Sequence, residues 1–236
     1  MSSTTDTAAH SEAGHGDDHA HPAFLHHHYD TPEQQFDAAK FAMWVFIATE
    51  ILMFGGLFVA YGLFRSQEPQ IFHLAHEHLN KIMGAANTIV LLFSSLTAAL
   101  AVREAQLGNR TRVNIYLIVT ILCACVFLVV KYFEYAHKFH DGLLPGRYFF
   151  AHLHTHPGEH PLPYRAHMFF ALYFMMTGLH GVHVLVGMSI LVWAMKVNMQ
   201  GKITPEYFTP IEIGALYWHL VDLVWIYLFP LLYLVG

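Results

Sequence analysis

The sequence predicts an all-α integral membrane protein, a bundle of five transmembrane helices. Of its 236 residues, 55% are apolar and only 12% are charged, whereas soluble domains carry about 25% charged residues. The apolar residues also gather in five long stretches instead of alternating with polar ones. A lipid environment explains both the excess of apolar residues and their distribution.

Each apolar stretch is long enough to cross a membrane. A helix of about 19 residues spans nearly 30 Å, the thickness of a bilayer's hydrocarbon core. Because no water reaches that core, backbone groups must pair within each segment, and the lack of alternation excludes a β-barrel. We therefore expect spans at residues 41–64, 83–102, 113–133, 168–195 and 217–235.

The first 40 residues form a separate region. They are polar, acidic and rich in histidine, and they lack the apolar segment of a cleaved signal peptide. We expect residues 1–40 to be a flexible tail and residues 41–236 to be the membrane domain. An odd number of spans places the termini on opposite sides, and Arg103, Arg110 and Arg112 in one short loop favour a cytoplasmic N-terminus.

Several kinds of binding are not expected. The chain has no basic stripe of the kind that binds nucleic acid. Cys123 and Cys125 are two residues apart and point to different faces of a helix, so we expect neither a disulfide nor a metal site there. Many histidines fall in the tail and in the long loop before the fourth span, without the regular spacing of a metal site.

Glu50 is the clearest ionisable residue inside a span. It lies about 13 Å from the start of the first stretch, and an ionisable group inside a membrane helix costs at least about 2.5 kcal/mol on insertion scales. Two interpretations stay open. Glu50 belongs to a proton path, or it is a neutral glutamic acid that bonds a neighbouring helix for packing.

The later spans carry further buried polar residues. His180 and His183 share one face of the fourth span with glycines that allow close packing, and His219 and Asp222 share one face of the fifth. Helical rise places His183, His219 and Asp222 within about 10 Å of the same membrane surface, so we expect one buried polar cluster. Glu134 ends the third span near the opposite surface and is expected to lie apart.

Histidines on facing membrane helices also allow a haem-ligand interpretation. His183 and His219 have similar predicted depths, as two axial ligands would require. A hydrogen-bonded network explains the same histidines more simply, because Asp222 lies three residues from His219. We therefore expect neither a metal nor a cofactor in this chain.

Four motifs together resemble a known family. They are the glutamate-bearing first span, F-E-Y at 133–135, G-L-H-G-V-H-V at 178–184 and Y-W-H-L-V-D-L-V-W at 217–225. In this order and spacing, from about His28 to the C-terminus, the chain is similar to cytochrome c oxidase subunit III of the haem-copper oxidases. Longer members of the family have seven spans, so the five spans here correspond to the last five.

The resemblance implies a subunit without an active site or redox centre of its own. In the family, subunit III packs on subunit I, which carries haems and a copper, next to subunit II. The complex is an aerobic respiratory oxidase that translocates protons and takes electrons from cytochrome c. The resemblance thus implies a multi-pass protein of the bacterial cytoplasmic (inner) membrane that stabilises the catalytic subunit. Glu50 matches the family's buried glutamate, which is associated with proton uptake.

The resemblance also implies phospholipid binding. Family members hold phospholipids in a cleft, and H-H-H-Y-D-T-P before the first span resembles the segment whose histidine meets a lipid headgroup. His28 and Lys40 are the expected contacts, because both lie where a lipid phosphate would be. In longer members, the two spans that this sequence lacks form one wall of that cleft.

Two alternative functions remain open. Relatives with the same fold occur as accessory proteins of nitric oxide reductase systems, and gene neighbourhood would separate this alternative from an oxidase. A membrane electron carrier with haem between His183 and His219 would instead give the isolated chain a haem absorption band.

Overall fold

The computed structural model describes residues 31–144 and 163–235. This part of the chain is helical, and five helices are long and apolar enough to cross a membrane, which confirms the predicted class. The elements in chain order are α1 (Pro32–Gln67), α2 (Pro69–His76), α3 (Lys81–Gln106), α4 (Arg110–His140), the 3-10 turn η2 (Tyr164–Ala166), α5 (His167–Met199), α6 (Thr209–Phe229) and the π-helical turn η3 (Pro230–Leu234).

Side-chain caps define where two of the spanning helices begin. The Thr31 hydroxyl accepts a hydrogen bond from the Gln34 amide at 3.2 Å, and a proline follows in the first turn of α1. The Asn80 side chain accepts hydrogen bonds from the amides of Ile82 and Met83, both at 3.1 Å, at the start of α3. Each cap pairs amides that the helix itself leaves without a partner.

The helices extend beyond the predicted spans. In α6, for example, the helix begins at Thr209, whereas the apolar stretch begins at Tyr217. Pro210 and Glu212 lie in the first turn of α6, where both residue types favour a helix start but lower the hydropathy. A prediction from hydropathy alone therefore begins this helix too late.

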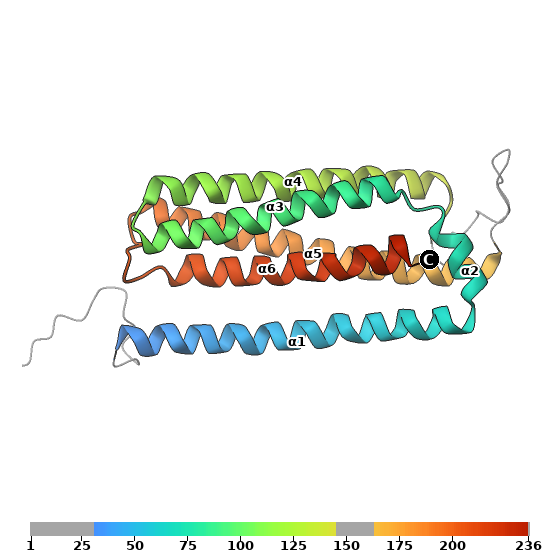
Figure 1. The fold of residues 1–236 in the computed structure, drawn as a ribbon, viewed down its shortest axis with the longest axis horizontal. Helices are drawn as coiled ribbons and strands as arrows, with labels where there is room; N and C mark the ends of the chain where they lie inside the picture. The colour runs from blue at the N-terminus through green and yellow to red at the C-terminus, as the bar shows by residue number, and fades with distance from the viewer. Residues whose placement is uncertain (1–30, 145–162, 236) are drawn as a thin grey trace, which may run out of the picture.

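The spanning helices lie side by side, with α6 near the centre (Figure 1). α6 packs against α1, α3 and α5, while α4 packs against α3 and α5. α1 touches the bundle through α5 and α6 and runs in the same direction as α6. The short α2 links α1 to α3 at the end where the C-terminus lies.

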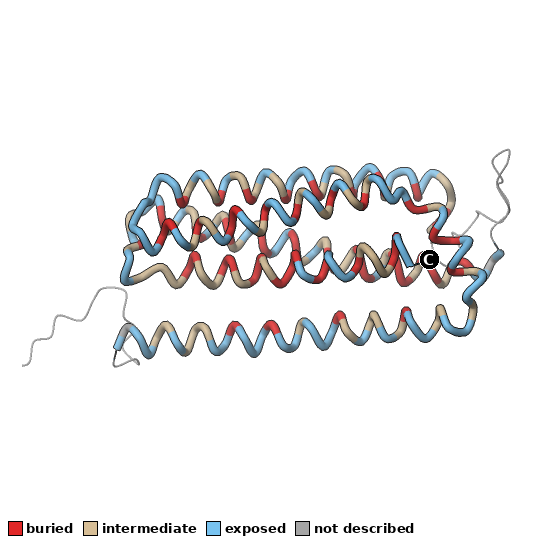
Figure 2. The backbone as a smooth tube through the Cα atoms, viewed as in Figure 1, coloured by how far each residue is buried: buried red, intermediate tan, exposed pale blue. Residues whose placement is uncertain are grey.

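Burial differs strongly between these helices (Figure 2). In the most apolar part of each helix, 56% of the α6 residues are buried, compared with only 17% of the α1 residues. Along most of its length α1 exposes large apolar side chains, such as Phe41, Leu52 and Val59. α1 is therefore a peripheral helix, and α6 supplies the core.

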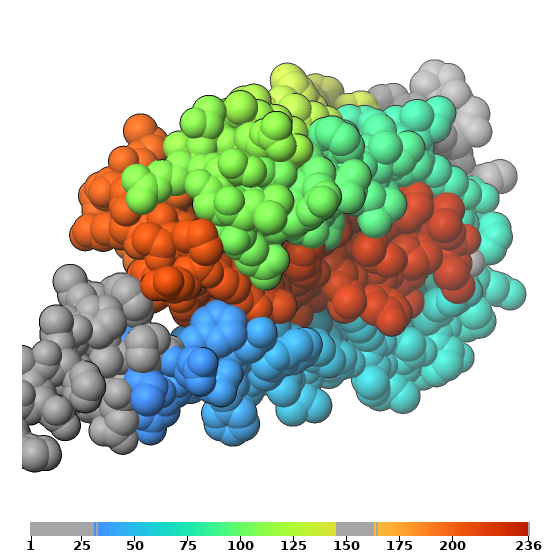
Figure 3. Space-filling view, turned by 60° about the vertical axis from the view of Figure 1, so that its left-hand side comes forward, coloured from blue at the N-terminus to red at the C-terminus, as the bar shows by residue number. Residues whose placement is uncertain are grey.

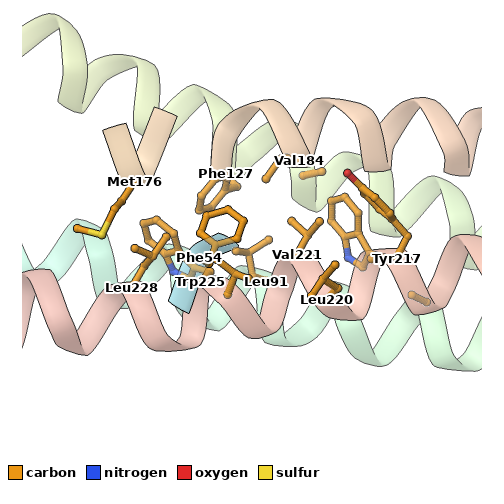
Figure 4. Packing of buried hydrophobic residues seen from close by; sticks show 14 of the residues in the cluster. Phe54, Leu91, Phe127, Met176, Val184, Tyr217, Leu220, Val221, Trp225 and Leu228 are labelled. Carbon is orange, nitrogen blue, oxygen red and sulfur yellow. The ribbon is translucent and has the colours of Figure 1, made fainter. Parts of the chain in front are cut away.

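The core is built around the aromatic residues of α6 (Figure 4). The Trp225 ring meets the Phe127 ring edge to face, with 4.8 Å between centroids. Gly187 lets Trp218 approach, since a Cβ there would lie 3.0 Å from the indole. Gly181, another glycine expected to allow close packing, has no neighbouring atom within 4 Å of such a Cβ. Gly84 makes the closest approach, because a Cβ there would lie 2.8 Å from the Phe229 ring.

Candidate functional site

Glu50 and His183 form an ionisable pair inside the membrane domain. The Nε2 atom of His183 lies 3.0 Å from the Oε2 atom of Glu50, which joins α5 to α1. The Nδ1 atom of His183 lies 2.8 Å from the Leu179 carbonyl oxygen, so Nδ1 donates its hydrogen there. With that tautomer, Nε2 accepts a hydrogen bond from the Glu50 carboxyl group when the acid is neutral, or donates one to the carboxylate when the imidazole is charged.

The surroundings of this pair are apolar on one side and open on the other. The Phe54 ring meets the His183 ring edge to face at 5.3 Å between centroids, and the Tyr217 hydroxyl donates a hydrogen bond to the His183 carbonyl oxygen at 3.4 Å. The side chains of Glu50 and His183 each remain 15% exposed. The two side chains hold one another in place, and a neighbouring molecule can still reach them.

His219 and Asp222 belong to a second polar group, between α6 and α3. The Nδ1 atom of His219 lies 2.7 Å from the Ser95 hydroxyl oxygen. Asp222 is buried, and its Oδ1 atom has no hydrogen-bond partner among the described residues. Ser95 therefore joins α3 to α6 through His219.

The structure thus separates residues that were expected to form one polar cluster. His183 bonds Glu50 on α1, whereas His219 bonds Ser95 on α3. His180 belongs to neither group, because its ring lies against the rings of Phe127 and Trp225 and both of its nitrogens are buried without a hydrogen-bond partner in the described part of the chain. Similar depth did not bring these residues together, since each histidine points toward a different neighbouring helix.

Glu134, a predicted buried polar residue, is the centre of a third group, whose other members were not predicted from the sequence. The Lys131 ammonium group donates hydrogen bonds to Glu134 at 2.8 Å, to the Tyr173 hydroxyl at 3.1 Å and to the Tyr233 hydroxyl at 3.0 Å. The Tyr233 hydroxyl donates to the other carboxylate oxygen of Glu134 at 2.6 Å. All four side chains are buried, and they link α4, α5 and the C-terminal turn η3.

Lys138 adds a second buried cation to this group. Its ammonium nitrogen lies 4.0 Å from Glu134 and donates a hydrogen bond to the His78 carbonyl oxygen at 3.3 Å. The sequence did contain a signal for this group, since Lys131, Glu134 and Lys138 are spaced three and four residues apart and therefore share one helix face.

Comparison with known proteins identifies the family. The family model described as cytochrome c oxidase subunit III matches residues 161–236, the region of α5 and α6. Cytochrome c oxidase subunit 3 of Corynebacterium diphtheriae is 31% identical over 195 residues, which cover 81% of this chain and 85% of that protein. The chain belongs to the haem-copper oxidase subunit III family.

Other members of the subunit III family are named as quinol oxidase subunits. Quinol oxidase subunit 3 of Bacillus subtilis is 30% identical over 196 residues, which cover 82% of this chain and 85% of that protein. The probable quinol oxidase subunit 3 of Staphylococcus aureus is 26% identical, with 88% of this chain and 94% of that protein covered. The chain is therefore subunit 3 of a haem-copper terminal oxidase, a multi-pass membrane protein with bacterial homologues, and the relatives include enzymes with either donor in their names.

Of the two residues expected to bind lipid in this subunit III, the structure describes only Lys40. His28 lies outside the described residues. The Lys40 ammonium group lies 2.7 Å from the Glu212 carboxylate and above the Phe36 ring, at the end of α1 where α6 begins. A lipid phosphate at Lys40 would therefore meet a cation that already has an intramolecular carboxylate partner.

The arrangement of histidines in this subunit III also bears on haem binding. Both ring nitrogens of His183 have hydrogen-bond partners, and the Nδ1 atom of His219 has one. Among the described residues, no three His, Cys, Asp or Glu side chains lie close enough to hold a metal ion. The two histidines considered as haem ligands instead point to separate polar partners.

Proposed function

We propose that this chain is a non-redox subunit III that supports proton supply to the catalytic subunit of its oxidase through the Glu50 and His183 pair. The observation that supports this proposal is the 3.0 Å contact between these two side chains, near the middle of α1. A carboxyl group and an imidazole at this distance can share and transfer one proton. The exposed fraction of each, 15%, leaves the pair accessible from outside the bundle.

The proposed partners are subunits I and II, with the haems and copper in those chains and no cofactor in this one. Subunit III family membership supports this arrangement. We take cytochrome c as the proposed donor, although relatives named as quinol oxidase subunits are about as similar to the chain. Steady-state oxidation of reduced cytochrome c, compared with oxidation of a quinol by the same purified complex, decides between the donors.

The second proposed role is structural, in stabilising the catalytic subunit and binding phospholipid in the bacterial cytoplasmic membrane with the N-terminus on the cytoplasmic side. Lys40 supports the lipid proposal, because its side chain is 39% exposed at a helix end where a phosphate would lie. Native mass spectrometry of the complex from wild type and Lys40→Ala tests it. Loss of a bound phospholipid in the variant is expected, and unchanged lipid content would contradict this role.

Glu50→Gln tests the proton-supply role directly. The glutamine side chain keeps the size and a hydrogen bond to His183 but cannot release a proton. We expect lower oxygen consumption by the purified complex, or a faster decline of activity over many turnovers. Ser189→Ala is the matched control, because Ser189 is also a polar residue of a span but bonds only the Leu185 carbonyl oxygen of its own helix. Equal activity and equal decline in Glu50→Gln and wild type would rule out the proposal.

A further inference from the structure

One face of α6 is left uncovered between α1 and α3. We define the open face of α6 by Leu216, His219, Leu223, Ile226 and Tyr227, which recur every three or four residues on one side of the helix. Leu223, Ile226 and Tyr227 are 46%, 39% and 59% exposed. Figure 3 shows α6 side chains at the surface between α3 and α1. Ser95 of α3 and Phe58 of α1 flank this face through their contacts with His219 and Tyr227.

The open face carries a polar group that lipid cannot satisfy. His219 is half-buried about ten residues into α6, and its Nε2 atom has no hydrogen-bond partner among the described residues, because only Nδ1 is bonded. The exposed hydroxyls of Thr49 and Ser189 differ, since each bonds a carbonyl oxygen of its own helix. An ionisable ring with a free nitrogen is costly at this depth, because acyl chains offer no hydrogen bond.

The buried neighbour of His219 is also incompletely paired. Asp222 is 3% exposed, and its Oδ1 atom lacks a partner in the described part of the chain. Two unsatisfied polar atoms therefore occur within one turn of α6. Asp222 is shielded from an outside partner, so it is the Nε2 atom of His219, beside the uncovered face, that indicates a polar partner from outside the described bundle.

The α1 side of the open face offers space for a helix backbone. Gly55 and Gly62 lie three residues before and four residues after Phe58, the residue that contacts Tyr227, so both are its neighbours on the helix surface. A Cβ atom at either glycine would meet nothing within 4 Å. Ala48 precedes Gly55 by the same seven-residue step. Small residues at this spacing permit two membrane helices to approach closely.

One of the small residues, Ala48, lies at the same depth as His219. Phe46 of α1 stacks on Tyr217 of α6, with 5.9 Å between centroids. Because α1 and α6 run in the same direction, Ala48 and His219, each two residues beyond that pair, lie at the same level. One helix that crosses this surface can therefore contact the small residues of α1 and reach His219 with a side chain.

We propose that the open face of α6, with the adjacent Gly55 and Gly62, is the docking surface for one transmembrane helix of another subunit, which places a hydrogen-bonding side chain against the Nε2 atom of His219. The inference rests on assembly of the chain into an oxidase complex, as proposed above. Interhelical packing on small residues and hydrogen bonds from polar side chains are the two forces that join helices in lipid, and this surface supplies both.

A photo-crosslinking residue at Leu223 tests the proposal in the intact complex. Leu223 lies on the open face, four residues from His219, and the matched control is Ile118 of α4, which is equally exposed at 46%. We expect a protein adduct with another subunit from position 223 and none from position 118, by mass spectrometry of the purified complex. Adducts at position 223 with lipid alone, or equal protein adducts at both positions, would overturn the proposal.

Substitutions at the same surface provide a second test. We expect Gly55→Leu and His219→Phe to reduce the amount of this chain that copurifies with a tagged catalytic subunit by roughly threefold to tenfold, because they remove close packing or the polar contact. Gly181→Leu and Ser189→Ala are the controls. A Cβ at Gly181 also meets no atom within 4 Å, and Ser189 bonds the Leu185 carbonyl oxygen of its own helix, away from the open face.

The outcomes separate this inference from the function on which it rests. If the wild-type chain copurifies with no haem-copper subunit, the proposed function fails. If it copurifies normally and Gly55→Leu and His219→Phe are retained as well as their controls, only the docking surface is wrong. Unchanged folding of both variants is checked by their thermal denaturation as isolated chains in detergent.

Discussion

The pair of Glu50 and His183 and the group around Glu134 are built from similar ionisable residues but differ in how they are enclosed. Glu134 is 5% exposed and receives hydrogen bonds from both a lysine and a tyrosine. Glu50 contacts one histidine and keeps a 15% exposed side chain at the junction with the peripheral helix α1. Enclosure therefore separates a carboxylate that joins several helices from one that, as we propose, exchanges a proton with its surroundings.

The largest expected effect comes from removing the charge of the enclosed carboxylate. Glu134→Gln leaves Lys131 and Lys138 buried without an anionic partner, which typically costs about 3–5 kcal/mol. We expect a strongly lowered thermal denaturation midpoint for the purified complex, measured by loss of soluble protein in detergent. Glu206→Gln, at an exposed loop residue, is the control and is expected to change little. Similar stability of the two variants would mean that the Glu134 group does not hold the helices together.

A smaller effect is expected from Tyr233→Phe. This change keeps the ring but removes the hydroxyl that bonds both Glu134 and Lys131, and a hydrogen bond to a charged group contributes about 1.5–3 kcal/mol. Denaturation midpoints of Tyr233→Phe, Glu134→Gln and the double variant form a cycle. Their effects should not add, because the residues share one network. Additive effects would contradict the coupling, and Tyr132→Phe, at a 71% exposed residue, should be neutral.

The smallest effect on stability is expected from Glu50→Gln. The amide still bonds His183, and the pair is partly exposed, so the free energy of unfolding should change by less than about 1 kcal/mol. The same denaturation measurement that detects Glu134→Gln should therefore barely detect Glu50→Gln. A loss of stability as large as that of Glu134→Gln would remove the distinction between the two sites and assign Glu50 a packing role.

The five spans were predictable because length and apolar composition determine them, but the contacts between them were not. Glu50 was recognisable as an isolated acid inside a span, yet its partner depends on α1 lying against α5. The predicted depths of the polar residues also depended on where each helix was taken to begin. α6 begins at Thr209 because proline and acidic residues favour a first helical turn, which hydropathy does not reveal.

The group around Glu134 illustrates a different limit. The spacing of Lys131, Glu134 and Lys138 indicated a shared helix face, whereas Tyr173 and Tyr233 lie 42 and 102 residues beyond Lys131. Only the packing of α5 and the C-terminal turn against α4 brings their hydroxyl groups to the charges. A sequence pattern within one helix can suggest a buried ion pair, but it does not reveal which distant residues enclose it.

The central position of α6 has a consequence for how the protein is made. Chains are synthesised from the N-terminus, so α1 to α5 enter the membrane before the helix that most of them pack against. Until α6 and its terminal turn arrive, Lys131 and Glu134 have no hydrogen bond from Tyr233, and Ser94 and Thr88 lack the indole donors of Trp218 and Trp225. These interior hydrogen bonds can therefore form only after α6 and η3 have been synthesised.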